Sequence, residues 1–118
     1  MRVALVADPV AAVFTKESVL ALADVPLKIY LPEHGDALAR QFHGGRVHRL
    51  LAQKQRQHPP ELQQVAAAKH MGFLAPFPRE VALTIPGLLD HAEGFDWEAF
   101  QQQFAVEVAD YFVLKFKR

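Results

Sequence analysis

A short apolar run near the start of the chain places the strongest constraint on its fold. The run Val3 to Ala7 is uninterrupted and is ended by Asp8 and Pro9. Successive apolar residues of this kind are typical of a strand that is covered on both faces, as in a parallel sheet. We therefore expect this segment to be the central strand of a sheet.

The next segments complete a strand–helix–strand unit. Thr15 is a suitable N-cap for a helix over residues 16–23, which the segment Asp24 to Pro26 would end. Residues 27–31 then alternate apolar and polar side chains between two prolines, as expected for a second strand with one exposed face. Because such units almost always cross over with the same hand, the two strands are predicted to be parallel.

The middle of the chain is predicted to be helical. We expect three helices, over residues 36–42, 46–57 and 61–71. Gly44-Gly45 separates the first two, and Pro59-Pro60 separates the second from the third, because proline starts a helix well but cannot continue one.

A third strand and a long helix are expected in the last part of the chain. Residues 81–85 alternate large and small side chains between prolines, and Asp96 precedes a stripe of apolar residues at helical spacing. The tail, residues 111–116, is rich in strand-forming residues, so either helix or strand is possible there. The fold class predicted is a small single α/β domain over residues 1–118, with a three-stranded, mostly parallel sheet and a helical insertion between strands 2 and 3.

The composition agrees with this class. The chain has 118 residues, about half of them apolar, and no cysteine. The absence of cysteine excludes disulfides, thiol nucleophiles and thiolate zinc sites, and fits a reducing compartment. No apolar run approaches the roughly 18 residues of a membrane span, and the start lacks a signal-peptide core. We therefore expect a cytoplasmic protein without a membrane partner.

Positive charge is concentrated in the middle of the chain. Residues 40–79 contain seven Lys and Arg residues against one acid, Glu61, whereas the segments on both sides are acidic and bring the net charge to zero. Helical spacing predicts a cationic face on the central helices. Its members are Arg40, Arg46, Arg49, Lys54 and Arg56.

This cationic face supports two functional hypotheses. The first is a non-catalytic binding or assembly module that docks an acidic protein surface or a second copy of the chain. The alternative is a protein that binds nucleic acid or a phosphorylated ligand through the same face, with an affinity that falls steeply with salt. Against nucleic acid, the domain is not basic overall, and aromatic residues are almost absent between Phe42 and Phe73.

A third hypothesis concerns the ends of the first two strands, where open parallel sheets bind their ligands. The polar residues there are Asp8, Glu33, His34 and Asp36. Three carboxylates and an imidazole could hold a divalent cation or transfer a proton, as in a small metal-assisted hydrolase or phosphotransfer enzyme. The same residues equally serve as a strand stop, a polar turn and a helix cap, so no catalytic residue is assigned from the sequence.

Two further features of the sequence bear on ligand binding. Gly44-Gly45 before Arg46 resembles an anion-binding turn, but no P-loop motif follows, and a hinge between helices explains the glycines equally well. The histidines lack the spacing of a zinc site and are expected to be exposed polar groups. The sequence therefore predicts no metal ligand and no cofactor.

Overall fold

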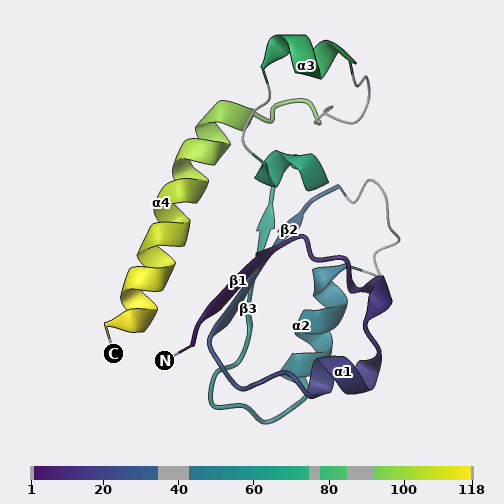
Figure 1. The fold of residues 1–118 in the computed structure, drawn as a ribbon, viewed down its shortest axis with the longest axis vertical. Helices are drawn as coiled ribbons and strands as arrows, with labels where there is room; N and C mark the ends of the chain where they lie inside the picture. Colours follow the sequence, from purple (N-terminus) through teal and green to yellow (C-terminus); the bar gives the residue numbers. More distant parts are fainter. Residues whose placement is uncertain (1, 35–42, 75–77, 85–91, 118) are drawn as a thin grey trace.

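A computed structural model describes residues 2–34, 43–74, 78–84 and 92–117. Three strands and several helices follow one another along the chain (Figure 1). In order, they are β1 (Ala4–Ala7), η1 (Ala11–Val13), α1 (Lys16–Leu20), β2 (Leu27–Pro32), α2 (Gly44–Ala52), β3 (Glu61–Val65), η3 (His70–Phe73), α3 (Arg79–Thr84) and α4 (Trp97–Phe116).

The three strands form a parallel sheet in the order β1-β2-β3. Ala4 pairs with Leu27, and Lys28 pairs with Glu61. The predicted α/β class is thus confirmed, including a helix between the second and third strands. The prediction that the first strand is central was wrong, because β2 occupies that place. An uninterrupted apolar run indicates that both faces of a strand are buried. It does not indicate whether one or both edges of the strand pair with neighbouring strands.

The third strand was predicted in the wrong segment. Residues 61–71 were expected to be a helix, yet Glu61–Val65 pairs with β2 along its whole length. Residues 81–85 were expected to be a strand, yet the described part of that segment belongs to the helix Arg79–Thr84. Glu, Leu and Gln favour helices locally, but pairing with a strand about thirty residues away overrides that weak preference.

The sheet lies between two helical layers (Figure 1). Ile29 and Tyr30 are adjacent in β2 and fully buried, so they point to opposite faces. Ile29 packs with Ala11, Val19, Val47 and Leu51, which come from η1, α1 and α2. Tyr30 packs against Phe73 and Phe104, which come from η3 and α4.

Helix boundaries follow the capping residues closely. The side chain of Thr15 accepts a hydrogen bond from the Ser18 N–H (3.1 Å), and that of Asp96 accepts one from the Ala99 N–H (3.0 Å). These N-caps confirm the predicted starts of α1 and α4. The long helix continues to Phe116, so the tail is helical.

Two helices are shorter than predicted. The first helix ends at Leu20 rather than at residue 23, and the helix expected over 46–57 spans Gly44–Ala52. The helix expected at 36–42 lies outside the described residues. Within the described ranges, no helix has both the length and the apolar character needed to cross a bilayer.

Candidate functional site at the carboxyl ends of the strands

Asp8, the residue that follows β1, has a buried carboxylate between two imidazoles. Its Oδ1 lies 3.0 Å from Nδ1 of His43, and its Oδ2 contacts Nδ1 of His70. Asp8 is only 5 % exposed, and its φ of 46° is in the left-handed region that residues other than glycine seldom occupy. A buried carboxylate in a left-handed conformation at a strand end marks this position as a candidate site.

Close packing of α2 against the sheet brings His43 to Asp8. His43 immediately precedes Gly44, and a Cβ atom at position 44 would lie 2.8 Å from Cγ2 of Ile29 and 2.9 Å from the ring of Pro9. Only glycine permits this approach without a shift of its neighbours. The imidazole of His43 is consequently placed beside Asp8 and is mostly buried.

A turn after β3 brings His70 to the same carboxylate. Ala67 in this turn has a φ of 61°, and its N–H donates to Oε2 of Glu33 (2.7 Å). The backbone N–H of His34 also donates to the carbonyl of Ala68 (3.1 Å). These bonds tie the end of β2 to the turn, and η3 then begins with His70.

The Asp8–His43–His70 cluster has the arrangement of an acid–base centre. An ionised carboxylate only accepts hydrogen bonds, so in this arrangement both Nδ1 atoms carry protons. In a neutral ring the proton-accepting nitrogen is then Nε2, and the carboxylate stabilises the ring when it becomes charged. Asp8 therefore contacts both imidazoles at their Nδ1 atoms.

A pocket of about 170 Å³ adjoins His43. It lies between the ends of β2 and β3 and the start of α2, and its lining consists of Leu31, Pro32, Glu33, His43, Gly45, Arg49 and Gln64. Nη1 of Arg49 lies 3.7 Å from the position that a Cβ atom of residue 45 would have, close to the helix N-terminus. α2 has neither a side-chain cap nor an acid in its first turn.

The structure groups the predicted strand-end residues only in part. Asp8 lies in the cluster and Glu33 lines the pocket, but the Glu33 carboxylate binds the Ala67 N–H and lies 3.8 Å from Nε2 of an exposed His34. Asp36 lies outside the described residues. Among the described residues, no three His, Asp or Glu side chains are arranged to hold a metal ion.

Sequence reasoning missed the two histidines. The prediction that His43 is an exposed polar group was wrong, because it is 9 % exposed and bound to Asp8. The glycine pair that follows it was a usable signal, since adjacent glycines allow close packing. No local signal marked His70, whose place depends on the unexpected third strand.

Two members of the predicted cationic face bind carbonyl groups of the α1 region. Nη1 of Arg46 donates to the carbonyls of Ala11 (3.4 Å) and Phe14 (2.9 Å). Nζ of Lys54 donates to the carbonyl of Leu20 (2.8 Å). Both side chains thus join α2 and the residues that directly follow it to the segment around α1.

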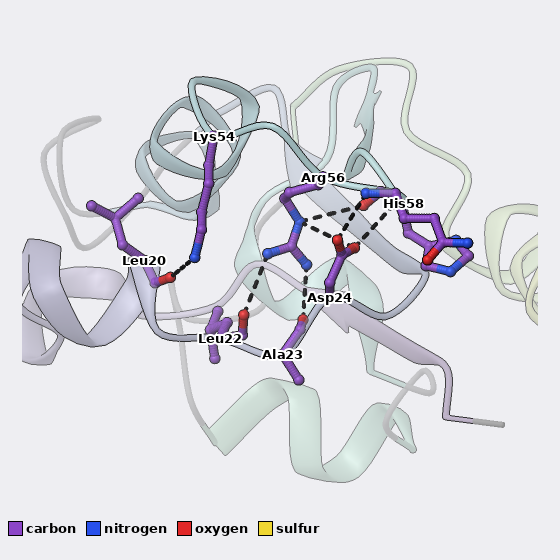
Figure 2. A network of polar contacts seen from close by, with 8 residues as sticks. Leu20, Leu22, Ala23, Asp24, Lys54, Arg56 and His58 are labelled. Atoms are coloured by element: carbon purple, nitrogen blue, oxygen red, sulfur yellow. Dashed lines mark hydrogen bonds and ion pairs between the residues drawn. The ribbon is translucent and has the colours of Figure 1, made fainter.

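Arg56 makes more polar contacts of this kind than Arg46 or Lys54 does (Figure 2). Its guanidinium donates to the carbonyls of Leu22 (3.3 Å) and Ala23 (2.8 Å) and lies 3.8 Å from Oδ1 of Asp24. Asp24 also accepts the backbone N–H groups of Gln57 and His58, at 2.8 and 3.0 Å. The hydrogen bond from Gln57, followed by that from His58 and the charge of Arg56, lowers the pKa of Asp24, and partial desolvation opposes this shift.

The remaining members of the cationic face differ from these three. Arg49 makes no hydrogen bond or ion pair with another described residue, and its guanidinium lines the pocket. Arg40 lies outside the described residues. Arg46, Lys54 and Arg56 therefore serve packing within the chain, whereas Arg49 belongs to the strand-end site.

No protein-family model matches the chain, and neither the curated proteins nor the solved structures contain a significant match to it. Its function is therefore inferred from its own geometry.

Proposed function

We propose that the chain binds a small phosphorylated ligand in the pocket beside His43 and acts on it by acid–base chemistry. The observation that carries this proposal is the buried Asp8 carboxylate shared by two imidazoles, one of which lines the pocket. Ligands of parallel α/β sheets bind at this edge, beyond the carboxyl ends of the strands.

The side of the pocket formed by the start of α2 favours an anion. The guanidinium of Arg49 and the positive N-terminus of α2 lie together, and α2 provides no acid to balance them. The carboxylate of Glu33 also lines the pocket, and its Oε2 accepts a hydrogen bond from the Ala67 N–H. A volume of about 170 Å³ fits a phosphate group and is smaller than the roughly 300–1,000 Å³ of pockets for larger ligands.

The proposed reaction is hydrolysis of a phosphate ester. His43, oriented through Nδ1 by Asp8, accepts at Nε2 a proton from the water that attacks phosphorus. The ester P–O bond breaks, and the leaving alcohol takes up the proton. One water is consumed, and Arg49 offsets the negative charge on the phosphoryl oxygens.

Binding is tested with inorganic phosphate in an NMR titration of the backbone amides. The expected result is a saturable shift of the Gly44, Gly45 and Arg49 signals that sodium chloride at equal ionic strength does not reproduce. Arg49→Gln should weaken binding about tenfold or more, because a hydrogen bond to a charged group contributes roughly 1.5–3 kcal/mol. Arg2→Gln is the matched control, since exposed Arg2 precedes β1 at the other end of the strands.

Catalysis is tested by turnover of p-nitrophenyl phosphate. Asp8→Asn is the informative variant, because asparagine tolerates the left-handed backbone but gives up the charge that fixes both imidazoles. We expect kcat to fall about 10²- to 10⁴-fold, the usual contribution of acid–base catalysis. Equal turnover by the variant and the parent protein would remove Asp8 and its histidines from the mechanism.

The cationic docking face remains a second proposal. Arg46 in α2 and Lys54 just after it bind uncharged carbonyl oxygens. This surface therefore keeps positive charge that would attract an acidic protein, a second copy or nucleic acid. Binding to polyglutamate or to an oligonucleotide that weakens steeply with salt would support it. An affinity that does not change with salt concentration would contradict this proposal.

A further inference from the structure

Helix α4 has an apolar stripe on each of two opposite sides. The first stripe packs on the domain: the ring of Phe104 lies 5.0 Å from that of Tyr30, the ring of Phe100 lies 5.8 Å from that of Phe73, and the Tyr111 hydroxyl lies 3.4 Å from the Ala4 carbonyl oxygen. The second stripe faces away from these contacts. All six of its residues are exposed. Five of them are apolar, namely Ala99, Val106, Ala109, Val113 and Phe116, and the sixth, Gln102, is polar.

The spacing of the second stripe is that of a helix-pairing seam. Its residues recur at alternating intervals of three and four, which is the a and d pattern of a heptad repeat over the full length of α4. Val106, Val113 and Phe116 are 60 %, 50 % and 55 % exposed, which is unusual for three large apolar side chains in one line. The stripe therefore has the form of an interface that lacks its second helix.

We propose that a second copy of this chain packs its α4 antiparallel on this stripe. The charges at the two ends of the helix specify both the partner and the orientation. Asp96 and Glu98 lie at the start of α4, and Lys117 lies at its end. Lys115 is on the side of the helix that faces the domain, where its Nζ lies 3.7 Å from Oε2 of Glu61. A parallel pair would bring like charges together, whereas an antiparallel pair places the acidic end of each helix beside the basic end of the other.

One antiparallel register fills the seam along its whole length. Ala99 then lies opposite Phe116 of the second copy, and Val106 lies opposite Ala109 of the second copy, so a small residue meets a larger one in these layers. In the layer between them, Gln102 lies opposite Val113 of the second copy. Asp96 and Lys117 occupy equivalent flanking positions and face each other in the same register. The two-fold symmetry of the pair repeats every contact, as a closed dimer requires.

The proposed interface is small. A helix of 20 residues is about 30 Å long, and one stripe on it falls at the low end of specific interfaces, below about 1,200 Å². The dimer is expected to be reversible, with a dissociation constant in the micromolar range or weaker. The dimer interface does not include the strand-end site, so a test of the dimer is independent of a test of the proposed function.

Sedimentation equilibrium over a range of protein concentrations tests the dimer. The expected result is a monomer–dimer equilibrium that Val113→Glu weakens at least tenfold. The matched control is Leu114→Glu, because Leu114 is also apolar and 66 % exposed but lies about 100° around the helix from Val113. A parent protein that stays monomeric at the highest concentration would overturn the proposal, as would equal effects of the two substitutions.

Cysteine cross-linking tests the orientation, since the chain has no cysteine of its own. A mixture of Ala99→Cys and Phe116→Cys chains should form mixed disulfides faster than either variant pairs with itself. Faster self-pairing of Ala99→Cys would indicate a parallel dimer and would overturn the antiparallel assignment. Circular dichroism of each variant confirms that α4 has remained folded.

Discussion

At the scale of single residues, Arg56 shows how one side chain can join distant parts of the chain. Its carbonyl partners, Leu22 and Ala23, lie 34 and 33 residues before it in the sequence. Its side chain is 2 % exposed, so its positive charge is satisfied by these oxygens and by Asp24. A buried guanidinium with several acceptors holds a loop in place far better than an exposed lysine with one.

Replacing Arg56 is therefore predicted to destabilise the fold. Arg56→Met keeps most of the side-chain volume but removes all its donors, and it leaves Asp24 without its cation. The expected loss is about 1–3 kcal/mol in the free energy of unfolding, measured by urea denaturation. Lys54→Met is the control: its ammonium group has one carbonyl acceptor, and the loss should stay below about 1 kcal/mol. Equal losses for the two variants would contradict this role of Arg56.

The candidate site was predictable from the sequence only as far as Asp8. A carboxylate that follows an apolar strand is placed at the ligand-binding edge by the strand itself. The positions of His43 and His70 depend instead on the packing of Gly44 against Ile29 and on the turn at Ala67. Such contacts join residues far apart in the chain, and one sequence does not report them.

At the scale of elements, capping residues correctly predicted the starts of helices, because a cap acts on neighbouring residues in the sequence. Thr15 and Asp96 cap their helices with their own side chains, so the starts of α1 and α4 could be predicted. The third strand could not, because Glu61–Val65 is stabilised by its pairing with β2. The same limit explains the misplaced central strand, since strand order is a property of pairing and not of the apolar pattern.

The two glycines at the start of α2 are predicted to respond in opposite directions to alanine. In Gly44→Ala, the new methyl group would lie 2.8 Å from Ile29 and 2.9 Å from Pro9, so we expect a loss of about 1–3 kcal/mol from overpacking. In Gly45→Ala, the nearest atom is 3.5 Å away, and the better helix propensity of alanine should add up to about 1 kcal/mol. Thermal and urea denaturation measure both changes. A harmless Gly44→Ala would mean that α2 packs less tightly than the structure shows.

At the scale of the whole molecule, two buried tyrosines join the layer of α4 to the sheet. The hydroxyl of Tyr30 donates to Oε2 of Glu107 (3.0 Å), and Tyr111 lies against the start of β1. Burial raises the pKa of Tyr111 to about 12, and a smaller contribution comes from Glu61. Burial, followed by the hydrogen bond to Glu107, also raises the pKa of Tyr30 above its ordinary value.

These shifts predict that the fold weakens in alkali. The unfolded chain ionises its tyrosines near pH 10.0, whereas folded Tyr111 keeps its proton to about pH 12, so stability is complete below pH 10.0 and falls as pH rises toward 12. Each group contributes at most about 1.4 kcal/mol per pH unit in that window. Urea denaturation at about pH 9 and about pH 11 measures the loss, and Tyr111→Phe should reduce it by about 1 kcal/mol. Lysines ionise in the same range in both proteins, so the difference between them isolates the tyrosine. An equal loss in parent and variant would show that the Tyr111 hydroxyl ionises alike in the folded and unfolded chain.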